Sequence, residues 1–230
     1  MKTIGLIGGM SWESTALYYR IINDTARERL GGLHSAPLVL WSVDFAEIER
    51  LQVAGDWQQA GRILGQAAAA LERAGAEFLV MTTNTMHLVA PAIESAVSIP
   101  LLHIADPTGE ALVAAGVTRV GLLGTGFTME QPFYADRLRS EFGLEVLIPP
   151  ADDRAVVHRI IYEELVLGVI RDESREAYRG VMRRLVEAGA QAIILGCTEI
   201  TLLVGQDDAT VPLFDTTTLH AAAAVERALA

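Results

Sequence analysis

The feature that most constrains the fold is an internal duplication. The segment LERAGAEFLVMTTNT (residues 71–85) resembles LVEAGAQAIILGCTE (residues 185–199), and two further blocks recur in the same order. Three matching blocks at offsets of 112 to 117 residues predict two halves built on one pattern. The alignment places Thr83 opposite Cys197, the only cysteine of the chain. The other two matches pair residues 4–20 with 120–137 and residues 98–106 with 210–218.

Each half alternates short apolar runs with longer helical patterns. Runs that are apolar on both faces and alternate with helices are typical of parallel sheets covered by helices. We therefore expect an α/β protein of two pseudo-symmetric domains, each a small parallel sheet flanked by helices, with the active site in the cleft between them. The Ala-rich C-terminal segment is expected to return to the first half. The predicted domains are residues 1–105 with 214–230, and residues 106–213.

Charge and cysteine content restrict the classes of partner. The chain of 230 residues has a formal net charge of −11, which argues against nucleic-acid and anionic-membrane surfaces because these require clustered positive charge. One cysteine allows no intramolecular disulfide, so a reducing cytoplasm is expected. The first apolar run is too short for a signal peptide, and no run approaches the ~20 apolar residues of a membrane span.

The informative loops follow the predicted strands, where ligands of open parallel sheets bind. If the halves are related by a pseudo-twofold axis, Thr83 and Cys197 approach a ligand from opposite sides. Two opposed acid/base groups suit inversion at a carbon atom. A thiol fits this role because positive surroundings, such as a helix N-terminus after Cys197, can lower its pKa. Such proton transfer requires no metal or organic cofactor. Candidate donors to a substrate carboxylate are Asn84, Thr85, Thr125 and Thr198.

These residues also carry a family resemblance over the whole chain. GLIGGMSWEST, TTNTMH, GLLGTGFTM, IIYEELVLG and GCTEI followed by VPLFDTT resemble the aspartate/glutamate racemase family, whose members are cofactor-independent enzymes of two pseudo-symmetric α/β domains. The resemblance implies a racemase of acidic amino acids, often a homodimer, in which Cys197 is a catalytic acid/base on the side of the L-enantiomer. It also implies substrate contacts from Asn84, Thr85, Thr125, Thr198, the Met10–Ser11 loop and the segment from Phe45 to Gln52.

The sequence departs from the family at Thr83, where the usual residue is cysteine. A hydroxyl is a very weak base at neutral pH, so the D-side of the site lacks an efficient base. Two alternatives remain open. One is a single-cysteine decarboxylase of the arylmalonate type, and the other is a binding protein that has lost catalysis.

The sequence does not determine which substrate side chain the site prefers. The basic residue that some aspartate-specific relatives carry after the IYE element is absent, because Leu165 and Val166 stand there, so the resemblance also allows broader or neutral substrates, while Arg50 is a candidate partner for a distal carboxylate. Glu163 and Glu164 either face the cleft or lie on a solvated helix face. His87 is expected to be a structural histidine, and His103 and His220 lie near predicted element ends.

Overall fold

The computed structural model describes all 230 residues as two compact units. The first unit comprises Met1–Ile104 and His220–Ala230, and the second comprises Ala105–Leu219. Each contains one four-stranded sheet in which all strands are parallel. The fold class predicted from the alternating pattern is therefore confirmed as an α/β structure with two helix-flanked parallel sheets.

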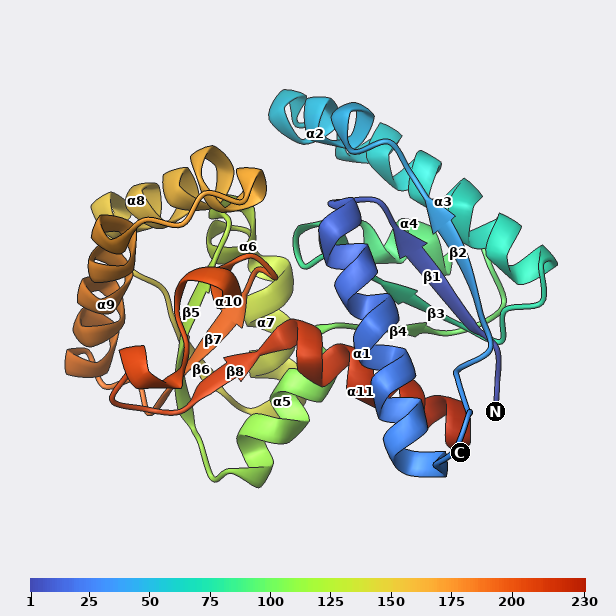
Figure 1. Ribbon diagram of the computed structural model, residues 1–230. Coiled ribbons are helices and arrows are strands. Elements are labelled where there is room, and N and C mark those ends of the chain that lie inside the picture. The colour runs from blue at the N-terminus through green and yellow to red at the C-terminus, as the bar shows by residue number, and fades with distance from the viewer. The chain divides into compact units, whose positions relative to one another are not determined.

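The first unit is built around the strand order β2-β1-β3-β4. Helices α1 and α11 cover one face of this sheet, and α2, α3 and α4 cover the other (Figure 1). The elements are β1 (Ile4–Gly8), α1 (Trp12–Leu30), β2 (Leu38–Ser42), α2 (Phe45–Ala54), α3 (Trp57–Arg73), β3 (Phe78–Met81), η1 (Thr85–Val89), α4 (Ala90–Glu94), β4 (Leu101–Leu102) and α11 (Thr216–Leu229).

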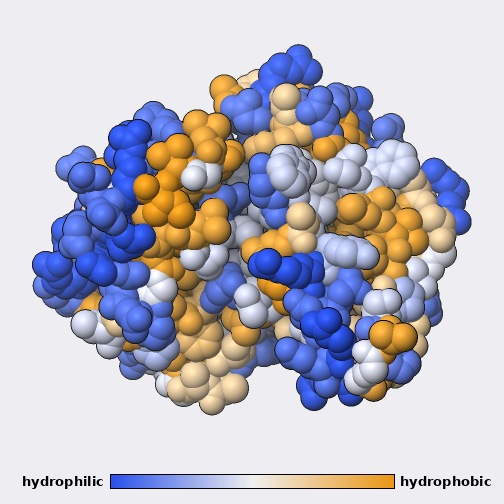
Figure 2. Space-filling model, viewed as in Figure 1, coloured by the Kyte–Doolittle hydropathy of each residue, from blue (hydrophilic) through white to orange (hydrophobic).

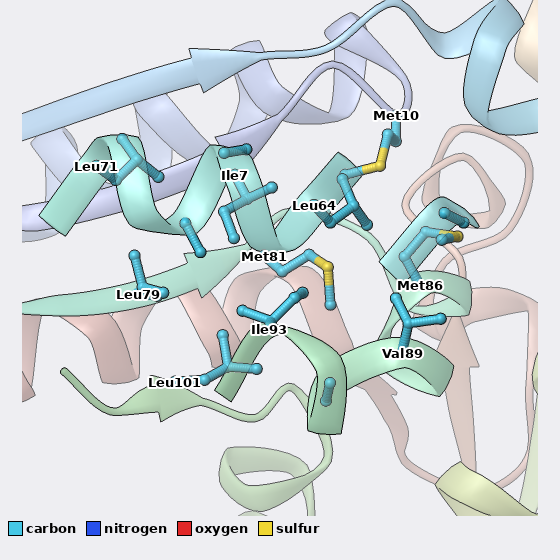
Figure 3. Close-up of a cluster of buried hydrophobic side chains, with 14 of the residues drawn as sticks. Ile7, Met10, Leu64, Leu71, Leu79, Met81, Met86, Val89, Ile93 and Leu101 are labelled. Carbon is cyan, nitrogen blue, oxygen red and sulfur yellow. The ribbon is translucent and has the colours of Figure 1, made fainter. Parts of the chain in front are cut away.

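One hydrophobic cluster fills the space between this sheet and α3. Figure 3 shows Leu64 and Leu71 of α3 facing Leu79 and Met81 of β3, and all four side chains are buried. Burial of each such side chain stabilises the fold by about 1.5–3 kcal/mol. The cluster holds the C-terminal ends of β1 and β3 in place, and Met10, in the loop after β1, belongs to it.

The second unit has the equivalent strand order, β6-β5-β7-β8. Helices α8 and α9 contact β5, while α5 packs against α7 and β8. The elements are α5 (Ala105–Ala114), β5 (Arg119–Gly124), α6 (Gly126–Glu130), α7 (Pro132–Phe142), β6 (Glu145–Leu147), α8 (Ala151–Glu163), η2 (Leu165–Leu167), α9 (Asp172–Glu187), β7 (Ala192–Gly196), α10 (Ile200–Leu203), η3 (Gln206–Asp208) and β8 (Leu213–Asp215).

The duplication seen in the sequence is reproduced in the local structure. Gly75 and Gly189, which the alignment superimposes, both follow a helix and have φ angles of 95° and 101°. This left-handed region favours glycine because other residues clash there. Both glycines therefore turn the chain from a helix into a buried strand, β3 in one unit and β7 in the other.

The chain returns to the first unit at His220. The predicted return at residue 214 falls inside β8, and β8 pairs in parallel with β7 of the second sheet. The pairing of Leu195 with Asp215 therefore places the end of β8 in the second unit. No helix of the structure combines the length and the apolar character that a membrane span requires.

Candidate active site

In the first unit, the strand ends bring two predicted loops to the same edge of the sheet. Ile7 of β1 pairs with Met81 of β3, so the loops that follow these strands are neighbours. The Thr15 hydroxyl connects them, because it accepts a hydrogen bond from the Gly9 amide at 2.8 Å and lies 3.0 Å from the Thr82 hydroxyl. The predicted binding residue Ser11 caps α1 by accepting from the Ser14 amide.

The loop after β3 contains Thr83, whose side chain is half-buried, followed by buried Asn84 and Thr85. The Ile104 amide donates to His87 Nε2 at 3.2 Å, so this nitrogen must be the acceptor. His87 Nδ1–H then donates to the Thr83 carbonyl oxygen at 2.7 Å, which fixes a neutral tautomer. The expected structural role of His87 is confirmed, and this role is to hold the backbone of Thr83.

Two further histidines are buried beside His87. The His103 ring centroid lies 4.5 Å from that of His87, and the His220 centroid lies 5.9 Å from it. His220 Nε2–H donates to the Leu102 carbonyl at 2.9 Å, so its Nδ1 accepts from the Tyr18 hydroxyl at 2.8 Å. The three imidazoles do not form a metal-binding group. They join the last helix to the ends of the strands.

In the second unit, Thr125 and Cys197 follow two paired strand residues. Gly124 of β5 pairs with Gly196 of β7, so the two following residues lie at the same edge of the sheet. The Thr125 hydroxyl caps α6 by accepting from the Thr128 amide at 3.2 Å. Beside Cys197, the Thr198 hydroxyl accepts from Thr217 Oγ1 at 3.2 Å. Three predicted site residues, Thr125, Cys197 and Thr198, are thus brought together in one unit.

The Cys197 thiol is partly buried and has an acidic neighbour. Its Sγ–H donates to Glu199 Oε2, with 2.9 Å between the two heavy atoms. Burial raises the pKa of Cys197 well above its ordinary value, and the Glu199 charge and the hydrogen bond raise it further, against a smaller opposite effect of the Glu199 amide. The expectation of a lowered thiol pKa is therefore wrong. The thiol is a neutral proton donor in this structure.

Glu199 is the functional candidate that sequence reasoning missed. The sequence does place it close to the thiol, because Glu199 follows Cys197 by two residues. The backbone between them forms a tight turn, in which the Ile200 amide donates to the Cys197 carbonyl at 3.2 Å. Helix α10 is only four residues long and begins after this turn. The carboxylate, rather than a helix N-terminus, consequently dominates the surroundings of the thiol.

Met10 and Gln52, both predicted to bind substrate, are buried in the first unit. The Met10 side chain lies within the hydrophobic cluster of Figure 3. Gln52 of α2 donates from Nε2 to Met86 Sδ at 3.0 Å, while its Oε1 is buried without a hydrogen-bond partner. An unsatisfied buried acceptor costs about 1–3 kcal/mol, so it is a candidate for a ligand contact. Arg50, on the same helix, is exposed.

Glu163, the last residue of α8, and Glu164, which follows it, have different environments. Glu163 is exposed, whereas Glu164 is buried and accepts from Ser174 Oγ at 2.5 Å and from Arg159 Nη1 at 3.0 Å. The hydrogen bond from Ser174 lowers the pKa of Glu164, and the hydrogen bond from Arg159 and the charges of Arg171 and Arg159 lower it further, against an opposite effect of burial. Glu164 therefore ties the α8–α9 connection to α9 and has a structural role.

Replacing Glu164 with glutamine is expected to lower the free energy of unfolding by about 1–3 kcal/mol at pH 7, because it removes a charged hydrogen-bond acceptor from a buried site. The folded-state pKa is lowered, so this stabilisation is complete above the ordinary carboxyl pKa and disappears as the pH falls through the lowered value. Urea unfolding of both proteins at pH 7 and at pH 3 measures the difference. A constant difference at both pH values would contradict this assignment.

Comparisons with known proteins agree with this arrangement. The sequence model of the family described as Asp/Glu/Hydantoin racemase matches residues 7–224. A proposed Asp/Glu racemase from Yersinia pestis is 57% identical, with a TM-score of 0.95 over 100% of both chains. PH1733, an aspartate racemase homologue from Pyrococcus horikoshii OT3, is 37% identical, with a TM-score of 0.87 over 100% of both chains. The broad specificity amino-acid racemase RacX of Bacillus subtilis (strain 168) is 23% identical over 99% of this chain and 98% of its own.

Proposed function

Because the chain belongs to the Asp/Glu/hydantoin racemase family, we propose that it is a cofactor-independent amino-acid racemase in which Cys197 transfers the α-proton. Family membership supports racemase chemistry, an isomerase activity on small amino-acid substrates. The single observation that carries the assignment of Cys197 is a partly exposed thiol at the C-terminal end of β7, next to the hydroxyl-bearing loop that begins at Thr125. Thiols of this kind are suited to general acid/base catalysis.

The proposed reaction passes through a carbanion at Cα. Its negative charge spreads into the α-carboxylate, which must be held by hydrogen-bond donors to lower the barrier. We propose that Asn84, Thr85, Thr125 and Thr198 supply these donors, with Ser11 and Gln52 as further substrate contacts. In this proposal Cys197 works on the face of the L-enantiomer and Thr83 lies on the opposite face. The proposal requires both strand-end loops to reach one substrate.

Acidic amino acids, aspartate and glutamate, are the substrates that we propose first. Exposed Arg50 is the candidate cation for their distal carboxylate. However, the connection between α8 and α9 is apolar, with Leu167 exposed to 70% and Ile170 to 47% (Figure 2). Leu165 and Val166 stand in this connection where some aspartate-specific relatives have a basic residue, so we propose neutral side chains as well, and a substrate panel must include them.

The test is exchange of the α-proton with solvent. The purified protein, with no added cofactor, is incubated in heavy water with L-aspartate, L-glutamate and a panel of neutral amino acids, and the Cα proton signal is followed by NMR. Loss of this signal with retention of the amino acid supports the proposal. Absence of exchange across the whole panel would exclude it.

Gln52 offers a test of the substrate contacts. Gln52→Leu removes the unpartnered buried oxygen, so the free energy of unfolding is expected to rise by about 1 kcal/mol. The same change removes a hydrogen-bond partner for the substrate, so KM is expected to rise about tenfold. Thermal unfolding and exchange kinetics measure the two effects. Lower stability with an unchanged KM would show that Gln52 has only a structural role.

A decarboxylase is the second candidate, and the state of Cys197 favours it. A neutral thiol can protonate a carbanion that forms when carbon dioxide leaves, and this reaction needs a single cysteine. Release of carbon dioxide from phenylmalonate would support this function. Exchange with amino acids and no release of gas would exclude it. A non-catalytic binding protein, the third alternative, predicts ligand binding without turnover.

We further propose a homodimer in the cytoplasm. The C₂ dimer is the commonest assembly of soluble oligomers, and a free cysteine fits a reducing compartment. Sedimentation equilibrium should give twice the chain mass of 24.8 kDa. A mass equal to that of one chain at micromolar concentration would exclude the dimer.

A further inference from the structure

The contact between Cys197 and Glu199 has a consequence for proton transfer. A neutral thiol cannot accept a proton, so Cys197 must first lose its own proton before it can act as a base. Its Sγ–H already points to Glu199 Oε2, with 2.9 Å between the heavy atoms. Both side chains are partly exposed. A proton that reaches the carboxylate can therefore exchange with water.

The other ionisable groups near the thiol are unsuited to this task. The Tyr178 hydroxyl of α9 interacts electrostatically with Cys197 and Glu199, but it is buried and donates to the Val157 carbonyl at 3.3 Å. Burial raises the pKa of Tyr178 well above its ordinary value, so this phenol stays neutral. The Glu164 carboxylate already accepts hydrogen bonds from Ser174 and Arg159. Of these three groups, only Glu199 makes a hydrogen bond with the thiol.

We propose that Glu199 is a second catalytic acid/base, which takes the Cys197 proton when the thiol acts as a base and returns it when the thiol acts as an acid. This inference rests on the racemase function proposed above. In the first step, the S–H bond breaks and an O–H bond forms on Glu199. The thiolate then takes the Cα proton, and the electron pair of the Cα–H bond remains on the substrate as the carbanion.

The thiol–carboxylate pair explains both how the thiolate forms and how protons from solvent reach it. Burial and the Glu199 charge raise the pKa of Cys197, so the thiolate is a minor species that forms only during turnover. Once Glu199 holds the former thiol proton, water can replace it with deuterium. The thiol that forms by taking the Cα proton can also exchange through the same carboxylate. Solvent deuterium consequently reaches Cα by way of Glu199.

Glu199→Gln tests this role, because glutamine keeps the shape and can accept from the thiol but binds no proton at neutral pH. The single cysteine of the chain makes alkylation by iodoacetamide specific for Cys197. The midpoint of the alkylation rate against pH is expected to fall in the variant, because the carboxylate charge that disfavours the thiolate is gone. The rate of α-exchange of L-glutamate is expected to fall about 10²–10⁴-fold, although the thiolate is more abundant.

Three outcomes separate this proposal from the function on which it rests. Exchange by Glu199→Gln at or above the rate of the unmodified protein would overturn the relay, because Glu199 would then only hold the thiol protonated. An unchanged alkylation midpoint would overturn the thiol–carboxylate pair, whether or not any amino acid exchanges. No exchange by the unmodified protein would instead overturn the racemase function. Glu199→Asp keeps a carboxylate and should retain more exchange than Glu199→Gln, with equal melting temperatures as the control for folding.

Discussion

Replacing Thr83 with cysteine is expected to raise the exchange of the α-proton of D-aspartate or D-glutamate by about 10²–10⁴-fold, the usual contribution of a positioned acid/base. In the proposed mechanism, Cys197 serves the L-enantiomer and Thr83 occupies the opposite face. A hydroxyl is too weak a base to deprotonate Cα at neutral pH. The unmodified protein should therefore exchange the L-enantiomer much faster than the D-enantiomer.

This asymmetry cannot change the equilibrium, because two enantiomers have equal free energies. It must appear as slow net inversion beside rapid exchange with retention of configuration. Thr83→Cys should increase net inversion together with exchange of the D-enantiomer. Polarimetry and NMR in heavy water follow the two processes in the same sample.

Thr83→Ser is the matched control, because it keeps the hydroxyl and should leave exchange of the D-enantiomer slow. Equal exchange of D- and L-substrates by the unmodified protein would contradict the interpretation. In that case Thr83, or a water molecule that it holds, would be a competent base. The hydrogen bond from His87 to the Thr83 carbonyl fixes the backbone and leaves the hydroxyl outside this contact, so the substituted thiol should start from the same position.

The fold was largely predictable because the sequence contains its pattern twice. Apolar strands alternating with helices indicated parallel sheets, and the offset between Thr83 and Cys197 is preserved in the register, where Met81 and Leu195 pair with Ile7 and Leu123. The residue at which the chain returns to the first unit was harder to predict from the sequence. It depends on the pairing of Leu213 with Ile193, a contact that strand propensity alone does not reveal.

The surroundings of the thiol could not be predicted for a different reason. Sequence spacing shows that Glu199 follows Cys197 by two residues, but it does not show where the carboxylate points. The turn closed by the Ile200 amide brings the two side chains together. Burial raises the pKa of the thiol, and the Glu199 charge raises it further, so the pKa rises instead of falling. Burial of the thiol and the local backbone conformation at Glu199 thus act in the same direction on its pKa.

The hydrogen-bonded Cys197 also permits a sharp test of whether the protein is a catalyst. Cys197→Ser is expected to reduce α-exchange of L-aspartate and L-glutamate by at least about 10²–10⁴-fold, because a serine hydroxyl cannot supply the acid/base function of the thiol. Serine can still donate to Glu199, so the local structure and substrate binding should persist.

Binding is measured separately by the stabilisation that a ligand gives to the folded state, which is about 2.7 kcal/mol when its concentration is one hundred times Kd. Both proteins should show the same ligand-dependent rise in melting temperature, while only the unmodified protein exchanges the α-proton. Exchange by Cys197→Ser at the original rate would remove Cys197 from the mechanism. Equal binding by both proteins with no exchange by either would identify a binding protein that has kept the fold and lost the chemistry. Rapid exchange confined to the protein with the thiol, with binding unchanged, would assign the proton transfer to Cys197 itself.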